Sequence, residues 1–240
     1  MATLLKTKAL YRTVRYHAAL NAGHTLTVNG ARQEPIDVFL RQSDIDSACA
    51  HHCVAMALII LGLVKRSAVI NQANRKSGFA AQLHQTLADG WFEGFHAKQL
   101  FDAIESMKLP LVARLSDDFK GVDAFAVKDL LDGKLVLLAY ESERNRHRHW
   151  VLGVGVSGFQ SGKSHPIIDT LLVLCPSSDP VPLASNNAKL CREQATKLSK
   201  SSASVSWQFE SMPYSCEPVR LLSAISLNFV PFHDNFELHS

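Results

Sequence analysis

Residues 42–64 read QSDIDSACAHHCVAMALIILGLV, a polar segment with acidic residues that runs into an almost wholly apolar one. Asp46 and Ser47 are suited to cap a helix, because their side-chain oxygens accept hydrogen bonds from the free amides of a first turn. The apolar residues that follow predict a helix buried on nearly all sides. Cys49 would then lie in the first turn, where free N–H groups and the helix dipole favour a thiolate. This stretch therefore predicts a nucleophilic thiol on a buried helix.

The segments around this helix predict an N-terminal part rich in helices. Residues 1–22 are expected to form an amphipathic or partly frayed helix, and Asn29-Gly30 between the runs HTLTV and IDVFL predicts a β-hairpin. Apolar residues at helical spacing predict helices over residues 79–87, 97–107 and 127–131, and DGWFEGF at 89–95 reads as an aromatic loop between the first two.

The second half of the chain has the pattern of a β-sheet. The runs KLVLLAYE (134–141), HWVLGVGV (149–156) and IIDTLLVLC (167–175) are nearly continuous in apolar residues, as in strands covered on both faces. Residues 177–204 are polar and are expected to form a long loop with one helix over 187–198, before further strands at 205–210 and 219–230. Helices first and antiparallel strands later predict an α+β architecture in a single domain, 1–240.

Composition excludes several classes of protein. The net charge of +3 and the absence of a basic helix argue against nucleic acid as a partner. Five cysteines in a chain of 240 residues do not suggest a disulfide scaffold. Cys49 and Cys53, with His51 and His52 between them, lack a second ligand pair at zinc-finger spacing, so we expect no metal and no cofactor.

The N-terminus has no apolar segment and cleavage site typical of a signal peptide, so we expect synthesis in the cytoplasm; export without a cleavable signal stays open. The longest apolar run, residues 54–64, is too short to span a bilayer, and no membrane insertion is expected.

His149 is the candidate general base. It begins a buried strand directly after a charged turn, so its imidazole is expected at the sheet edge that faces the tip of the Cys49 helix, with Trp150 shielding the pair from water. The alternative is a histidine that only ends a strand.

Gln42, Cys49 with its apolar helix, HWVLGVG at 149–155 and the strand end LCPSS at 174–178 together resemble the papain-like cysteine peptidases. The likeness is to the C39-like type, which includes bacteriocin-processing peptidases, and it covers residues 36–178. Residues 1–35 would be an N-terminal extension with the hairpin, and 179–240 a polar loop with closing strands. The resemblance implies a papain-like fold in which N-terminal helices, including the nucleophile helix, pack on a C-terminal antiparallel sheet. It also implies that Cys49 is the nucleophile, His149 the general base and Gln42 an oxyanion donor.

The chain departs from that family at two places. The family's Gly-Pro after the nucleophile is Ala50-His51 here, and alanine is still small enough for a substrate to approach. The Asp-Pro expected at the end of the strand after His149 is Cys175-Pro176, and a thiol is a weaker hydrogen-bond partner than a carboxylate. Asp179 is a candidate to orient His149 instead, Asp169 lies too far along the strand, and a Cys–His dyad without a third member is also open.

Two further features have two readings each, and a third is discounted. The arginines at 144, 146 and 148, with His147, could select an acidic partner or could form a solvated turn. The aromatic residues Trp91, Phe92 and Phe95 could form a subsite wall or a satellite core. SGKS at 161–164 lacks the earlier glycine of a phosphate-binding loop and is discounted.

The resemblance implies a cysteine peptidase that hydrolyses peptide bonds of a protein or peptide substrate. A leader-peptide processor and a signal-less secreted bacterial effector or toxin are both compatible with it, and an inhibitory or immunity protein is a conceivable partner. Two alternatives stay open: a cysteine amidase or deamidase with the same Cys–His pair, and an inactive binding module.

Overall fold

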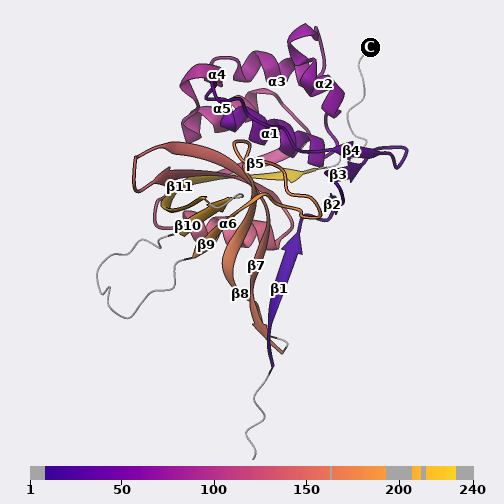
Figure 1. The fold of residues 1–240 in the computed structure, drawn as a ribbon. Coiled ribbons are helices and arrows are strands. Elements are labelled where there is room, and N and C mark those ends of the chain that lie inside the picture. Colours follow the sequence, from indigo (N-terminus) through magenta and orange to yellow (C-terminus); the bar gives the residue numbers. More distant parts are fainter. Residues whose placement is uncertain (1–8, 163, 193–206, 212–214, 231–240) are drawn as a thin grey trace, which may run out of the picture.

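The structure is a computed structural model that describes residues 9–162, 164–192, 207–211 and 215–230. Figure 1 shows helices α1 to α5 gathered on one side of a large antiparallel β-structure, from which β1 and the ends of β7 and β8 extend away. The helices of this group are α1 (Cys49–Ile60), α2 (Arg66–Ile70), α3 (Phe79–Leu87), α4 (Gly90–Glu93) and α5 (Ala97–Ser106), with a 3₁₀ turn, η1 (Gln72–Asn74), between α2 and α3.

Six strands close into an antiparallel barrel in the order β7-β6-β11-β10-β9-β8. They are β6 (Leu135–Ser142), β7 (Arg148–Ser161), β8 (Ile167–Leu174), β9 (Ala188–Arg192), β10 (Trp207–Ser211) and β11 (Ser215–Phe229). Closure follows from β8, which pairs with β7 on one edge and with β9 on the other.

The predicted fold class, a papain-like α+β fold with helices on an antiparallel sheet, is wrong: the structure is mostly β, and only 26% of the described residues are helical. The physical reason is that the C-terminal strands do not form an open sheet. They pair with one another until the first and last strands meet, which leaves no free edge inside the barrel.

Two further strands pair with strands of the barrel, and three others form a separate sheet. β1 (Leu10–Tyr16) pairs with β7, and β5 (Leu111–Ser116) pairs with the C-terminal half of β11. The small sheet contains β2 (Asn21–Ala22), β3 (Leu26–Asn29) and β4 (Pro35–Asp37). The predicted hairpin around Asn29-Gly30 is confirmed, because β3 and β4 pair antiparallel.

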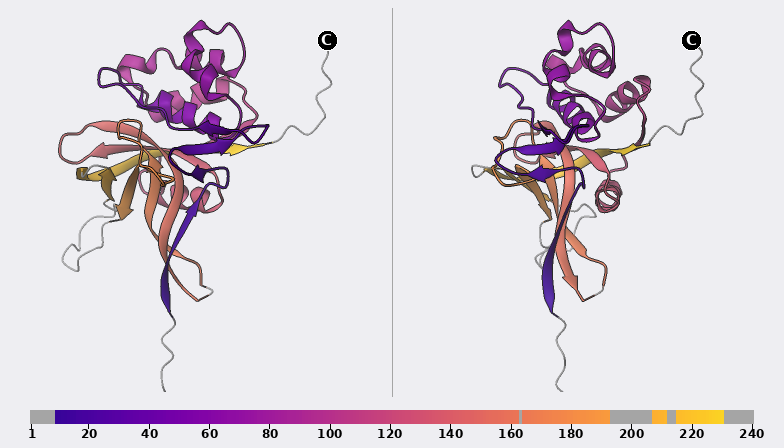
Figure 2. Two further views of the ribbon diagram at one scale, coloured as in Figure 1. Left: turned by 45° about the vertical axis from the view of Figure 1, so that its right-hand side comes forward. Right: turned by 90° about the vertical axis from the view of Figure 1, so that its right-hand side faces the viewer.

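The side chains of β6 alternate between two cores. Leu135, Leu137 and Ala139 join α1 in one hydrophobic cluster. Val136 and Leu138 join a second cluster, to which all six barrel strands contribute and onto which α6 (Val122–Leu131) packs. Figure 2 shows α6 on a different side of the β-structure from α1 to α5. Strands covered on both faces explain why their sequences are nearly all apolar.

α1 is apolar on almost its whole circumference, and eleven of its residues are buried. A helix of that composition is stable only inside a domain, and it lies between the barrel and the other helices. None of the described helices has the length and apolarity required to cross a membrane.

The sequence misassigned three local elements. Residues 10–16, inside the expected N-terminal helix, form β1 because they pair with β7; residues 1–8 lie outside the described part. Residues 188–192, expected to be helical, form β9, and 193–198 lie outside the described residues. The loop at 89–95 contains the short helix α4.

Candidate functional site

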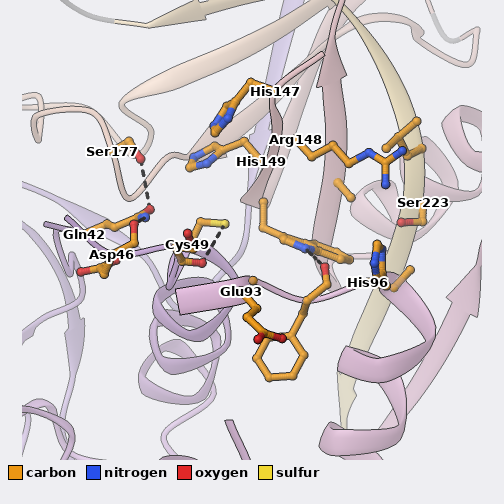
Figure 3. A pocket seen from close by; sticks show the side chains of 17 residues that line it. Gln42, Asp46, Cys49, Glu93, His96, His147, Arg148, His149, Ser177 and Ser223 are labelled. Atoms are coloured by element: carbon orange, nitrogen blue, oxygen red, sulfur yellow. Dashed lines mark hydrogen bonds between the residues drawn. The ribbon is translucent and has the colours of Figure 1, made fainter. Parts of the chain in front are cut away.

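A pocket of about 260 Å³ opens between the start of α1, the start of β7 and the segment that joins α4 to α5. The three predicted site residues, Gln42, Cys49 and His149, all line it. Figure 3 shows the Cys49 and His149 side chains in this pocket, Cys49 from the tip of α1 and His149 from the strand above it. The fold therefore brings together residues that are far apart in the chain.

Cys49 is the first residue of α1, as predicted, but the helix is not capped as predicted. The N-cap is Ala48, without a side-chain hydrogen bond. The Asp46 carboxylate instead accepts hydrogen bonds from the amides of Ala48 (3.0 Å) and Ser43 (3.2 Å), so it closes the turn before the helix. The Cys49 thiol donates a long hydrogen bond, 3.8 Å, to the Ser47 carbonyl.

The Cys49 thiol is buried, with 7% of the residue exposed. Burial raises the pKa of the thiol, and the backbone N–H groups of Trp150 and Ala50 offset this only in part. The prediction that the helix terminus holds a thiolate is therefore wrong in direction: desolvation outweighs the helix dipole, and Cys49 rests as a neutral thiol.

His149 lies on β7 opposite Tyr140, and the residue is 6% exposed. Burial, with a smaller contribution from His147, lowers the pKa of its imidazole to about 3. His149 is therefore neutral near pH 7. A neutral imidazole has one nitrogen free to accept a proton, but a pKa of about 3 makes it a weaker base than a histidine whose pKa lies near the operating pH.

Cys175, which stands where the resemblance led us to expect an aspartate, lies next to His149. Its Sγ lies 3.3 Å from His149 Nε2. The Asn187 side chain holds the backbone of Cys175 in place. Its Oδ1 accepts a hydrogen bond from the Cys175 amide at 2.7 Å, and its Nδ2 donates one to the Cys175 carbonyl at 2.9 Å.

The two aspartates considered for this role lie elsewhere. Asp179, the candidate, is exposed and forms an ion pair with Arg41 at 2.7 Å. Asp169 pairs with Arg12 at 3.0 Å, and it is absent from the pocket lining, as expected from its place on the strand. Neither carboxylate has a hydrogen bond to His149 within the described residues.

Gln42 joins the turn before Cys49 to the end of β8. Its backbone amide donates to the Pro176 carbonyl at 2.9 Å, and its side-chain oxygen accepts from the Ser177 hydroxyl at 3.1 Å. The side-chain Nε2 donates to the Asp46 carbonyl at 2.7 Å. One amide hydrogen is used in that bond, so the second is the one that a bound substrate could engage.

The far side of the pocket is formed by Trp150 and the segment after α4. The Trp150 indole donates to the Phe95 carbonyl at 3.0 Å, which holds this segment against β7. Phe95 lines the pocket, whereas Trp91 and the highly exposed Phe92 do not. Of the three aromatic residues predicted as a subsite wall, only Phe95 lies at this site.

Arg148 and His147 lie at the rim, and Arg144 and Arg146 are absent from the lining. Arg148 and Arg146 contact the Glu141 carboxylate at 3.2 and 3.1 Å. The basic turn therefore mostly serves an ion-pair cluster, and its proposed preference for an acidic partner is an untested prediction.

Sequence reasoning missed His96, Leu222 and Ser223 in the pocket lining. Leu222 and Ser223 enter it at an irregularity in the pairing of β11 with β6, between Leu221 and Ser223. No local pattern marks such a position, because it is defined by the pairing of two strands that are distant in the chain.

No protein-family model matches the chain, and no curated protein is detectably similar to it. The resemblance to C39-like peptidases thus stays a prediction based on the motif residues. Within the described ranges, no group of three or more His, Cys, Asp or Glu side chains is arranged to hold a metal ion.

Proposed function

We propose that the protein is a cysteine peptidase that cleaves peptide bonds of a protein or peptide substrate, with Cys49 as nucleophile and His149 as general base. The observation that carries the proposal is that Cys49, His149 and Gln42 line one pocket. A second observation supports it: His149 is buried, neutral and in contact with a further side chain, Cys175, so its ring is held in place.

In the first step the Cys49 sulfur attacks the substrate carbonyl while its proton passes to His149. Nε2 of His149 contacts Cys175, so Nδ1 is the nitrogen that would take the Cys49 proton; within the described residues the resting Cys49 thiol bonds to the Ser47 carbonyl and not to His149. Nδ1 can accept only in the tautomer that carries the ring hydrogen on Nε2, and the sulfur of Cys175 is a weak acceptor for that hydrogen.

The negative charge that develops on the carbonyl oxygen needs donors. The backbone N–H of Cys49 lies in the first turn of α1, where amides have no partner within the helix. The second amide hydrogen of Gln42 is the side-chain candidate. Together they would form an oxyanion hole of one backbone donor and one side-chain donor.

The reaction then follows acyl transfer. The protonated His149 gives its proton to the leaving amine, and a thioester to Cys49 remains. His149 next takes a proton from water, the hydroxide attacks the thioester, and the acid product leaves as Cys49 regains its proton.

The resting state differs from a preformed ion pair. Because burial raises the pKa of Cys49 and lowers that of His149, both groups are neutral before substrate binds. The proton therefore moves from Cys49 to His149 as the sulfur attacks the carbonyl. The rate depends on how well the side chains that line the pocket stabilise the charges that develop in this step.

The test is a comparison of new protein N-termini by mass spectrometry after a proteome is treated with the wild type, Cys49→Ala or His149→Gln. New termini that appear only with the wild type support the proposal. Cys49-dependent conversion of amides to acids without new termini would replace the peptidase by an amidase, and the absence of both changes would leave a binding module.

A further inference from the structure

A second pocket, of about 310 Å³, lies beside the other face of α1 and shares no lining residue with the pocket of Cys49. Its walls come from α1, α2, η1, the segment before α1 and α4. The residues that line it are Leu40, Arg41, His51, His52, Ala55, Arg66, Val69, Ile70, Gln72 and Trp91. Two of these are arginines, two are histidines, and none is acidic.

Arg66 is the unusual member of this set. Its side chain is half-buried, and its Nε is buried without a hydrogen-bond partner. Arg192 and Arg220 also have a buried Nε without a partner, but their terminal nitrogens pair with Asp123 at 2.8 Å and Glu141 at 2.9 Å. Within the described residues, Arg66 has neither an ion pair nor a side-chain hydrogen bond.

A guanidinium that is partly removed from water and has no counter-charge is unfavourable, and arginine is suited to pair with the oxygens of phosphates and carboxylates. Arg41 adds a second positive charge at the same pocket; it is exposed and its partner is the exposed Asp179. Asp46, the acid in the segment before α1, accepts hydrogen bonds from the amides of Ser43 and Ala48.

The histidine and tryptophan side chains give the rest of the wall its polar character. Nδ1 of His52 contacts the Ala48 carbonyl at 2.9 Å, which fixes the ring and leaves Nε2 as its other polar atom. His51 is 2% exposed, contacts Gln72 at 3.1 Å through Nε2, and has no partner at Nδ1. Trp91 packs on His51 with the ring centres 5.0 Å apart, and its indole nitrogen also has no partner. Buried polar atoms normally have partners, so this wall is incomplete by itself.

We propose that this pocket binds a small oxyanion, a molecule with a phosphate or carboxylate group whose charged end pairs with Arg66. The pocket also contains apolar side chains, among them Ala55, Val69 and Ile70, which suit the organic part of such a molecule.

The test is titration calorimetry with inorganic phosphate and, separately, with acetate, at constant ionic strength and pH 7. Wild type should bind at least one of them saturably, and which one binds distinguishes the phosphate from the carboxylate class. Arg66→Gln should weaken that binding about tenfold or more, because a charge-assisted hydrogen bond is removed. Arg75→Gln removes an equal charge from an exposed arginine after η1 that does not line the pocket, and it should bind like the wild type.

Absence of saturable binding of either anion to the wild type would overturn the proposal, as would an equal loss in both variants, which would indicate general electrostatic attraction. The stability without ligand gives an independent check. If Arg66 is an unpaired cation that awaits a ligand, Arg66→Gln keeps or raises the melting temperature in anion-free buffer. A clear fall would indicate that Arg66 supports the fold, and it would contradict the binding role.

Discussion

Acidification from pH 7 to pH 5 should reduce the folding stability of this protein by about 4 kcal/mol through two buried histidines, His149 and His51. Both are almost fully buried, and burial lowers the pKa of each imidazole to about 3. In the unfolded chain a histidine titrates near 6.5. Below that pH the unfolded state binds protons that the folded state does not, so stability is lost as the pH falls from about 6.5 towards 3.

The magnitude follows from the width of that window. At pH 5 the unfolded histidine is about 1.5 pH units below its pKa, and one unit corresponds to about 1.4 kcal/mol, so each residue contributes about 2 kcal/mol of destabilisation. Asp129 and Glu141, whose pKa values are lowered, stabilise the fold above their unfolded pKa values. Their contribution is lost only as the pH falls through the lowered values, near and below about 4, outside this window.

The assay is urea denaturation at pH 7, 6 and 5, followed by circular dichroism. His149→Gln and His51→Gln should each remove about 2 kcal/mol of the pH-dependent loss, and His17, whose pKa burial also lowers, adds to the loss that remains. His165→Gln, at an exposed position, should leave the loss unchanged. A stability that stays level from pH 7 to pH 5 in the wild type would refute the neutral, buried state of these imidazoles. So would a loss that is the same in all three variants.

Three further predictions concern single side chains. Gln42→Ala should lower kcat on substrate by roughly 100- to 1000-fold through loss of an oxyanion donor, and a change confined to KM would remove Gln42 from that role. Cys175→Ala should lower kcat by roughly 3- to 10-fold, because one neutral hydrogen bond to His149 is lost. Cys175→Asp should raise the pKa of His149, which would shift the pH profile of kcat; identical pH profiles for this variant and the wild type would contradict the contact. Asp129→Ala should destabilise the fold by about 1–3 kcal/mol in urea denaturation, since the buried carboxylate holds Lys134 at 3.0 Å, and an unchanged midpoint would argue that this ion pair does not contribute.

The helices and central strands could be predicted from the sequence because their signals are local. α1 follows from its continuous apolar run after a polar turn, α3 and α5 follow from apolar spacing, and β6, β7 and β8 follow from short apolar runs. Barrel closure could not be predicted in this way, because it depends on which strands pair. Residues 10–16 and 188–192 have ambiguous local patterns, and pairing with β7, and with β8 and β10, makes them strands.

The composition of the candidate site was predictable, whereas its electrostatics were not. Cys49, His149 and Gln42 are recognisable residue types next to recognisable elements, and Cys175 occupies the place at the strand end where the resemblance implied an aspartate. The protonation state depends on how deeply each group is buried. The helix terminus favours a thiolate, but burial of Cys49 has the larger effect on its pKa.

The most direct test of the proposed Cys–His pair is the rate at which iodoacetamide modifies Cys49 at pH 7 in the wild type and in His149→Gln, measured by peptide mass spectrometry. Cys216, which is exposed, serves as the internal control and should react equally in both proteins. If His149 accepts the Cys49 proton, Cys49 in the wild type reacts roughly tenfold faster or more than in the variant. Equal rates for Cys49 in the two proteins would show that His149 does not activate the thiol, and they would contradict the proposed mechanism.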